Sequence, residues 1–146
     1  MDATPIIVGV DGAEDSVRAL RWAADYARAF DAPLHVLTAY DVPAMFGPYA
    51  MAGWEDPARL EKDARRVLAD TVRETLGDEA RVTERVVRGH AAEALVHASA
   101  DAQLLVMGSR GRGGFAGMLM GSVSQHVVSH SKCPVVVMPH SAVDDR

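Results

Sequence analysis

Glycine is concentrated in one segment, residues 108–124, which reads GSRGRGGFAGMLMGSVS and contains six glycines. Ordering a glycine costs more backbone entropy than ordering any other residue, so a folded domain rarely gathers them without a use for bare backbone. Gly108 and Gly111 can open their N–H groups toward an anion, and Arg110 and Arg112 add guanidinium groups nearby. The chemistry that this pattern favours is the binding of a polyanion by main-chain donors.

A second glycine cluster supplies the other side of such a site. Gly121 precedes a helical pattern at 122–131, for which Ser122 is the expected cap. The first N–H groups of a helix have no intrahelical partner and carry the positive end of its dipole. Ser122 and Ser124 add hydroxyl groups. A di- or triphosphate held between the loop and the helix start would explain why side chains are kept away from this backbone.

Two other interpretations of the segment remain open. A merely flexible loop would contain as many glycines, although a buried strand and a helix cap enclose this one. The dinucleotide fingerprint Gly-x-Gly-x-x-Gly/Ala matches loosely at 111–116, but that fingerprint belongs after the first strand of a domain. A Walker loop is excluded because the chain contains no Gly-Lys-Ser/Thr triplet.

The elements that must position these residues alternate between strand and helix. Apolar runs predict strands at 5–11, 33–40, 81–87, 103–108 and 133–139, and helical periodicity covers 13–30, 57–76, 91–100 and 122–131. This alternation predicts a single α/β domain, residues 1–146, with a doubly wound five-stranded parallel sheet and helices on both faces. Because 81–87 alternates charged and apolar residues, it is expected at an edge, which gives the order 3-2-1-4-5. Ligands then bind beyond strands 1 and 4, and the glycine segment leaves strand 4 there.

Two further patterns concern surfaces of this fold. The first helix repeats apolar residues that are expected to face the core, namely Val17, Leu20, Ala24, Ala27 and Phe30. Arg18 and Arg21 are expected on its solvated face. Residues 41–56 fit neither period and are predicted to form a long loop that covers a ligand or contacts a partner.

Composition limits the classes of partner. The 146-residue chain has a net charge of −5 and no basic face of five or six residues, which argues against a nucleic-acid partner. No apolar run approaches the ~20 residues of a membrane helix, so a cytoplasmic protein without a membrane partner is expected. The single Cys133 excludes an internal disulfide framework. His126 and His130, one turn apart, could chelate a metal, but no third ligand at a suitable spacing is evident.

The spacing Gly108-x2-Gly111-x9-Gly121-Ser122 resembles the nucleotide-binding signature of the universal stress protein family, in its ATP-binding branch. The segments IIVGVDGAEDSVRAL (6–20) and SKCPVVVM (131–138) are also similar to that family, so the resemblance spans nearly the whole chain. It implies an adenine nucleotide alpha hydrolase-like fold and a stress-response protein that binds ATP with Mg²⁺. It also implies a homodimer formed through the last strand.

The resemblance implies roles for individual residues. Gly9 and Asp11 would lie beside the nucleoside, with Asp11 bonding a ribose hydroxyl, although Asp11 could instead cap the first helix or its turn. Tyr40 would present its backbone to the adenine edge, and Met107 would line the base pocket. The phosphates would be surrounded by Gly108, Arg110, Gly111, Arg112, Gly121, Ser122, Val123 and Ser124. In one departure, relatives often have proline shortly after the position of Gly89, where this chain has His90.

The functional hypothesis is a nucleotide-dependent regulatory protein. No general base or nucleophile is evident beside the predicted phosphate site, so no catalytic residue is assigned and at most weak ATP hydrolysis is expected. One alternative is a slow ATPase or nucleotide transferase that uses Asp11 or a serine of the site. Another is a structural dimer whose glycines serve packing alone. The valines at 135–137 on a free sheet edge independently predict a homodimer, because such an edge must be covered. The sequence names no downstream partner.

Overall fold

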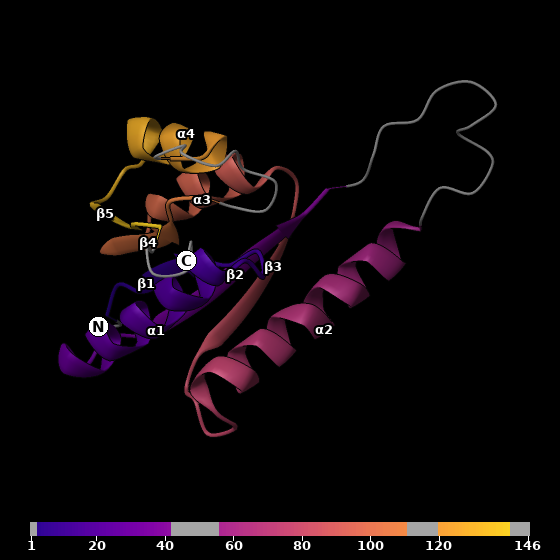
Figure 1. Ribbon diagram of the computed structural model, residues 1–146, viewed down its shortest axis with the longest axis horizontal. Helices are drawn as coiled ribbons and strands as arrows, with labels where there is room; N and C mark the ends of the chain where they lie inside the picture. Colours follow the sequence, from indigo (N-terminus) through magenta and orange to yellow (C-terminus); the bar gives the residue numbers. More distant parts are fainter. Residues whose placement is uncertain (1–2, 42–55, 111–119, 141–146) are drawn as a thin grey trace.

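The computed structural model describes residues 3–41, 56–110 and 120–140, which contain a five-stranded parallel sheet (Figure 1). The strands are β1 (Ile6–Gly9), β2 (Leu34–Tyr40), β3 (Thr83–Arg88), β4 (Leu104–Gly108) and β5 (Val135–Met138). They lie in the order β3-β2-β1-β4-β5, and every neighbouring pair is parallel. The predicted α/β class and strand order are confirmed.

Four helices cover the two faces of this sheet within the described residues: α1 (Glu14–Ala29), α2 (Pro57–Leu76), α3 (Ala91–Ser99) and α4 (Ser122–His130). Figure 1 shows α1 and α2 on one side of the sheet and α3 and α4 on the other. Helix α2 has the predicted bounds, because Asp56 caps it by accepting a 3.1 Å hydrogen bond from Ala58 N. Gly77, with φ +93°, ends it.

The central strands are buried on both faces, which is why they read as continuous apolar runs. Along β1, Ile6 and Val8 pack in a core shared with α1 and α2, whereas Ile7 packs in a second core with α3 and α4. Strands β3 and β5 form the edges, and all four residues of β5 are only half-buried. None of the helices among the described residues is long and apolar enough to cross a membrane.

Phe30 does not face the core as its spacing suggested. Helix α1 ends at Ala29, and Phe30 is 65% exposed, with its ring 4.5 Å from that of Tyr26 between centroids. The core side of α1 is instead occupied by small residues such as Ala19 and Ala23, which let the helix lie close to the sheet. Most of the loop predicted at 41–56 lies outside the described residues.

Candidate functional site

The carboxyl ends of β1 and β4 meet at the point where the winding of the sheet reverses. Helix α1 follows β1 to one face, and α4 follows β4 to the other. Val8 pairs with Val106, so Gly9 and Asp11 lie at the same end of the sheet as Gly108. Open α/β sheets bind ligands at this place because no helix covers the strand ends there.

The two glycine clusters converge through Ser109. The N–H of Gly121 donates to the carbonyl oxygen of Ser109 at 2.7 Å, and the hydroxyl of Ser124 donates to the same oxygen at 2.6 Å. The N–H of Ser109 donates to the carbonyl of Met138 at 2.9 Å. We call residues 108–110 and 121–124 together the β4–α4 junction. Its two halves face each other, but the N–H groups of Ser109 and Gly121 are already bonded within the protein.

Further backbone N–H donors lie in the first turn of α4. Its N-cap is Gly121 rather than the expected Ser122, because the helical backbone begins at Ser122. A glycine cap offers no side-chain acceptor, and among the described residues no side chain caps the first-turn N–H groups of Ser122, Val123 and Ser124. The side chains of Ser122 and Val123 are exposed, whereas Ser124 is 2% exposed and its hydroxyl is spent on main-chain carbonyls.

Gly108 lacks a side chain at the point where the first turn of α1 approaches the end of β4. A Cβ at this position would lie 2.7 Å from Asp15 Cβ and 2.9 Å from the carbonyl carbon of Asp15. The absence of a side chain thus allows the first turn of α1 to pack against the end of β4. The close approach predicted for a ligand is made here by α1.

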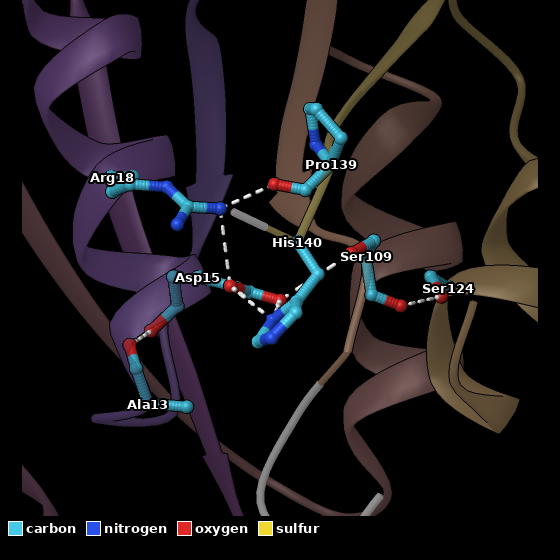
Figure 2. Close-up of polar contacts among 8 residues, drawn as sticks. Ala13, Asp15, Arg18, Ser109, Ser124, Pro139 and His140 are labelled. Carbon is cyan, nitrogen blue, oxygen red and sulfur yellow. Dashed lines mark hydrogen bonds and ion pairs between the residues drawn. The ribbon is translucent and has the colours of Figure 1, made fainter. Parts of the chain in front are cut away.

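Asp15 lies at the centre of a buried polar network (Figure 2). Its carboxylate accepts from Arg18 at 3.1 Å and from the Ser109 hydroxyl at 3.3 Å, and His140 Nδ1 lies 3.3 Å from Oδ1. Arg18 also donates to the carbonyl of Pro139. The expectation that Arg18 belongs to a solvated face is wrong, because its side chain is only 26% exposed and joins α1 to the end of β5.

Asp11 shapes the turn that leaves β1. Its Oδ1 accepts from the N–H of Ala13 at 2.9 Å, and its own N–H donates to the Ser16 hydroxyl at 3.3 Å. Gly12 takes the positive φ of +85° that this turn requires. Ala13 is the N-cap of α1, so Asp11 stabilises the preceding turn and does not cap the helix. The residue is exposed, which leaves its carboxylate accessible.

A cleft of about 200 Å³ opens beside Asp11, between β1, β2 and α2. Its lining includes Val10 and Gly12 after β1, Thr38 on β2, and Asp63 and Val67 on α2. This size suits one flat ring system, since sites for whole drug-sized ligands start at about 300 Å³. The α2 residues of the cleft were missed because nothing in the helix pattern indicates which stretch of α2 reaches the strand ends.

The backbone at the end of β2 is oriented differently from the prediction for Tyr40. The carbonyl of Tyr40 accepts from the N–H of Gly89 at 2.8 Å, so its main-chain groups face β3. Neighbouring residues of a strand point these groups to opposite sides. Ala39 therefore presents its N–H and carbonyl on the β1 side. Two residues earlier on the same side, the carbonyl of Leu37 accepts from the N–H of Val10. Met107, 5% exposed, packs in the α3–α4 core and is not part of the cleft.

The remaining candidates from the sequence are three glycine-segment or histidine features that do not form part of the cleft or of the Asp15 network among the described residues. Gly111 and Arg112 lie outside the described residues. His90 Nδ1 lies 3.0 Å from Asp41 Oδ2, and this exposed contact joins the end of β2 to the start of α3. The rings of His126 and His130 stack with 4.2 Å between their centroids. In the described part of the chain, no three His, Cys, Asp or Glu side chains are grouped to hold a metal ion.

Comparison with known proteins gives one consistent family. The family model described as the universal stress protein family matches residues 3–139. A universal stress protein of Mycobacterium tuberculosis strain H37Rv is 40% identical over 141 residues, which cover 94% of this chain and 46% of that protein. This chain spans about half the length of the curated relatives that it matches.

Solved structures match the fold along almost the full chain. A universal stress protein in complex with cAMP has a TM-score of 0.68 and 29% identity, covering 94% of this chain and 97% of that one. A universal stress protein of Archaeoglobus fulgidus in complex with dAMP has a TM-score of 0.68 and 23% identity, covering 94% of this chain and 99% of that one. At that lower identity the likeness concerns the fold alone.

Proposed function

Because the chain belongs to the universal stress protein family, we propose that it binds an adenine nucleotide, ATP with Mg²⁺, and acts as a nucleotide-dependent regulator in the stress response. The observation that carries this proposal is the first turn of α4, which has a glycine N-cap and no side-chain cap, together with a cleft of about 200 Å³ at the end of β1. One feature suits phosphate groups and the other suits a base, and a nucleotide contains both.

The phosphates would lie at the first turn of α4. Three N–H groups and the positive end of the helix dipole favour an anion there without any acidic cap to compete. Arg110, which follows β4, adds positive charge on the opposite side of the junction. Magnesium is usually held by phosphates, waters and few protein groups, so the ion would arrive with the nucleotide.

The base would occupy the cleft. We expect Ala39, rather than Tyr40, to offer main-chain N–H and carbonyl groups to its edge, because Tyr40 is bonded to Gly89. Asp11 is exposed and lines the cleft after β1, the strand that lies beside β4, and there a ribose hydroxyl would donate to its carboxylate. Asp63 on α2 could accept from an exocyclic amino group, which adenine has and hypoxanthine lacks.

A regulatory role is preferred over rapid catalysis because hydrolysis needs a positioned base as well as a binding site. Ser109 and Ser124 are both buried and hydrogen-bonded within the protein, which makes either a poor nucleophile. The slow-ATPase alternative therefore depends on Asp11 or on the exposed Ser122. We further propose that β5, a half-buried edge strand of three valines and a methionine, is covered by a second copy in a cytoplasmic homodimer.

The test uses a substitution with opposite effects on stability and binding. A carboxylate in Ser122→Asp would interact favourably with the helix dipole and stabilise α4, yet it would repel a phosphate at the same place. We expect the variant to melt no lower than the wild type while its affinity for ATP and Mg²⁺ falls at least about tenfold in calorimetric titration. Ser129→Asp, exposed near the far end of α4, is the matched control and should bind normally.

Two results would defeat the proposal. One is the absence of binding heat with ATP, AMP or cAMP at about 100 µM wild-type protein, where even a micromolar site involves about 8 kcal/mol. The other is unchanged affinity in Ser122→Asp, which would place the anion elsewhere. Phosphate release at several turnovers per minute that is lost in Asp11→Ala would favour the ATPase alternative.

A further inference from the structure

The carboxylate of Asp15 is almost completely enclosed, with the residue only 3% exposed. Burying a charged group is unfavourable unless it is paired and hydrogen-bonded. Asp15 finds its partners in three places: Arg18 one turn along α1, Ser109 after β4, and His140 after β5 (Figure 2). One residue therefore connects three segments that are far apart in the sequence.

Ser109 transmits the position of Asp15 to both halves of the β4–α4 junction. Its hydroxyl donates to Asp15 Oδ2 at 3.3 Å, while its carbonyl holds the N–H of Gly121 and the hydroxyl of Ser124. The bare backbone of Gly108 lets Asp15 approach closely. A shift of Asp15 would therefore move Ser109 and, through Ser109, the first turn of α4.

His140 gives this arrangement a dependence on pH. Imidazole is the side chain that ordinarily changes its charge between pH 5 and 8. The described contacts place the Asp15 carboxylate of α1 against it. The same carboxylate is paired with the Arg18 guanidinium and accepts from the neutral hydroxyl of Ser109, which precedes Arg110 after β4. A protonated imidazole makes a charge-assisted hydrogen bond to Asp15, which is shorter and stronger than a neutral one.

We propose that Asp15 is a positioning residue for nucleotide binding and that His140 is its pH-dependent partner. The inference rests on the proposed function, because the junction that Asp15 orders is the suggested phosphate site. Protonation of His140 compensates the negative charge of Asp15 near the phosphates and holds Ser109 in place. Lower pH within the range 8 to 5.5 therefore strengthens nucleotide binding.

The pH arm of the test compares the wild type with His140→Gln, which keeps a hydrogen-bond donor but does not titrate. Nucleotide dissociation constants are measured from pH 8 to pH 5.5 with ATP and Mg²⁺. The titration of ATP itself affects both proteins equally and cancels in the ratio of their dissociation constants. We expect the wild type to gain about threefold to tenfold more affinity than the variant over this range. Asp15→Asn should flatten the profile in the same way, and parallel profiles for all three proteins would overturn the role of His140.

The positioning arm uses Ser109→Ala, which removes the hydrogen bond to Asp15 without changing any charge. Ser129→Ala on the exposed side of α4 is its control. We expect the N–H of Gly121 to exchange with deuterium about tenfold faster in Ser109→Ala, measured without nucleotide, and nucleotide affinity to fall about fivefold or more.

The two measurements separate this inference from the proposed function. If the wild type binds no nucleotide, the proposed function fails, while the exchange rate of Gly121 still reports whether Ser109 orders the start of α4. If Ser109→Ala exchanges and binds like the control, Asp15 has no positioning role. Faster exchange with unchanged affinity would also overturn the proposal, since the ordered junction would then be irrelevant to the ligand.

Discussion

Replacing Gly108 by alanine tests whether internal packing requires bare backbone at the end of β4. The new Cβ would lie 2.7 Å from Asp15 Cβ, 2.9 Å from the Asp15 carbonyl carbon and 3.1 Å from the N of Ser16. Two of these atoms belong to the backbone of α1, which cannot rotate out of the way. Gly9→Ala is the matched control, because the atoms nearest to its Cβ would be the two methyl groups of the Leu95 side chain, at 3.0 and 3.1 Å.

The expected difference follows from these neighbours. Alanine restricts the unfolded chain and by itself stabilises a position of ordinary backbone by about 0.4–1 kcal/mol. Overpacking against a neighbour that cannot give costs about 1–3 kcal/mol, whereas a flexible side chain yields at little cost. We therefore expect Gly108→Ala to lower the free energy of unfolding by about 2 kcal/mol and Gly9→Ala to change it by less than about 0.5 kcal/mol.

Chemical denaturation followed by circular dichroism measures both changes. A loss of about 2 kcal/mol corresponds to a fall in Tm of roughly 4–8 °C for a domain of this size. If Gly108→Ala were as stable as Gly9→Ala, α1 would not press against the end of β4. The packing explanation for this glycine would then be refuted, together with the close approach of Asp15 to the junction.

Three further predictions concern stability away from the junction. Burial, followed by the positive charge of Arg85, lowers the pKa of His35 below its usual 6.5, so folding disfavours its charged form. The free energy of unfolding should fall as pH drops below 6.5, and His35→Leu should weaken that fall in denaturation curves recorded from pH 8 to 5; equal slopes would contradict the assignment. Asp56→Ala should cost about 1 kcal/mol by removing the cap of α2, whereas Asp56→Asn, which still caps, should cost much less. Gly77→Ala should cost about 1 kcal/mol from its φ of +93° alone, since nothing lies within 4 Å of the new Cβ, and a neutral result would mean that the backbone there relaxes freely.

The alternation of strands and helices could be predicted because its signals are local. Continuous aliphatic runs distinguish the buried β1 and β4 from the charged edge strand β3, and that contrast favours the observed strand order. The cap and proline at the start of α2 define its first residue in the same way. Once the order is known, parallel topology places the ends of β1 and β4 together, so the position of the candidate site also follows from the sequence.

What the sequence did not reveal depends on how closely distant segments approach. From the sequence, Asp15 is predicted to be a first-turn acid that interacts favourably with the helix dipole, and Arg18 is predicted to be solvated. In the structure both are partly or fully buried, because α1 packs against Gly108 and the end of β5. Strand register decides whether Ala39 or Tyr40 offers its backbone groups to the cleft. A shift of the register by one residue would turn every backbone group of the strand to the other side.

Residue types and their periodicity therefore determined the elements, the order of the strands and the position of the candidate site. Tertiary structure alone decided which amides at that place bond to the protein's own carbonyl groups and which carboxylate became buried. The physical reason is that periodicity is a property of neighbouring residues, whereas the burial of Asp15 and the bond from Gly121 to Ser109 depend on contacts across elements. Such contacts exist only after the sheet and its helices have packed.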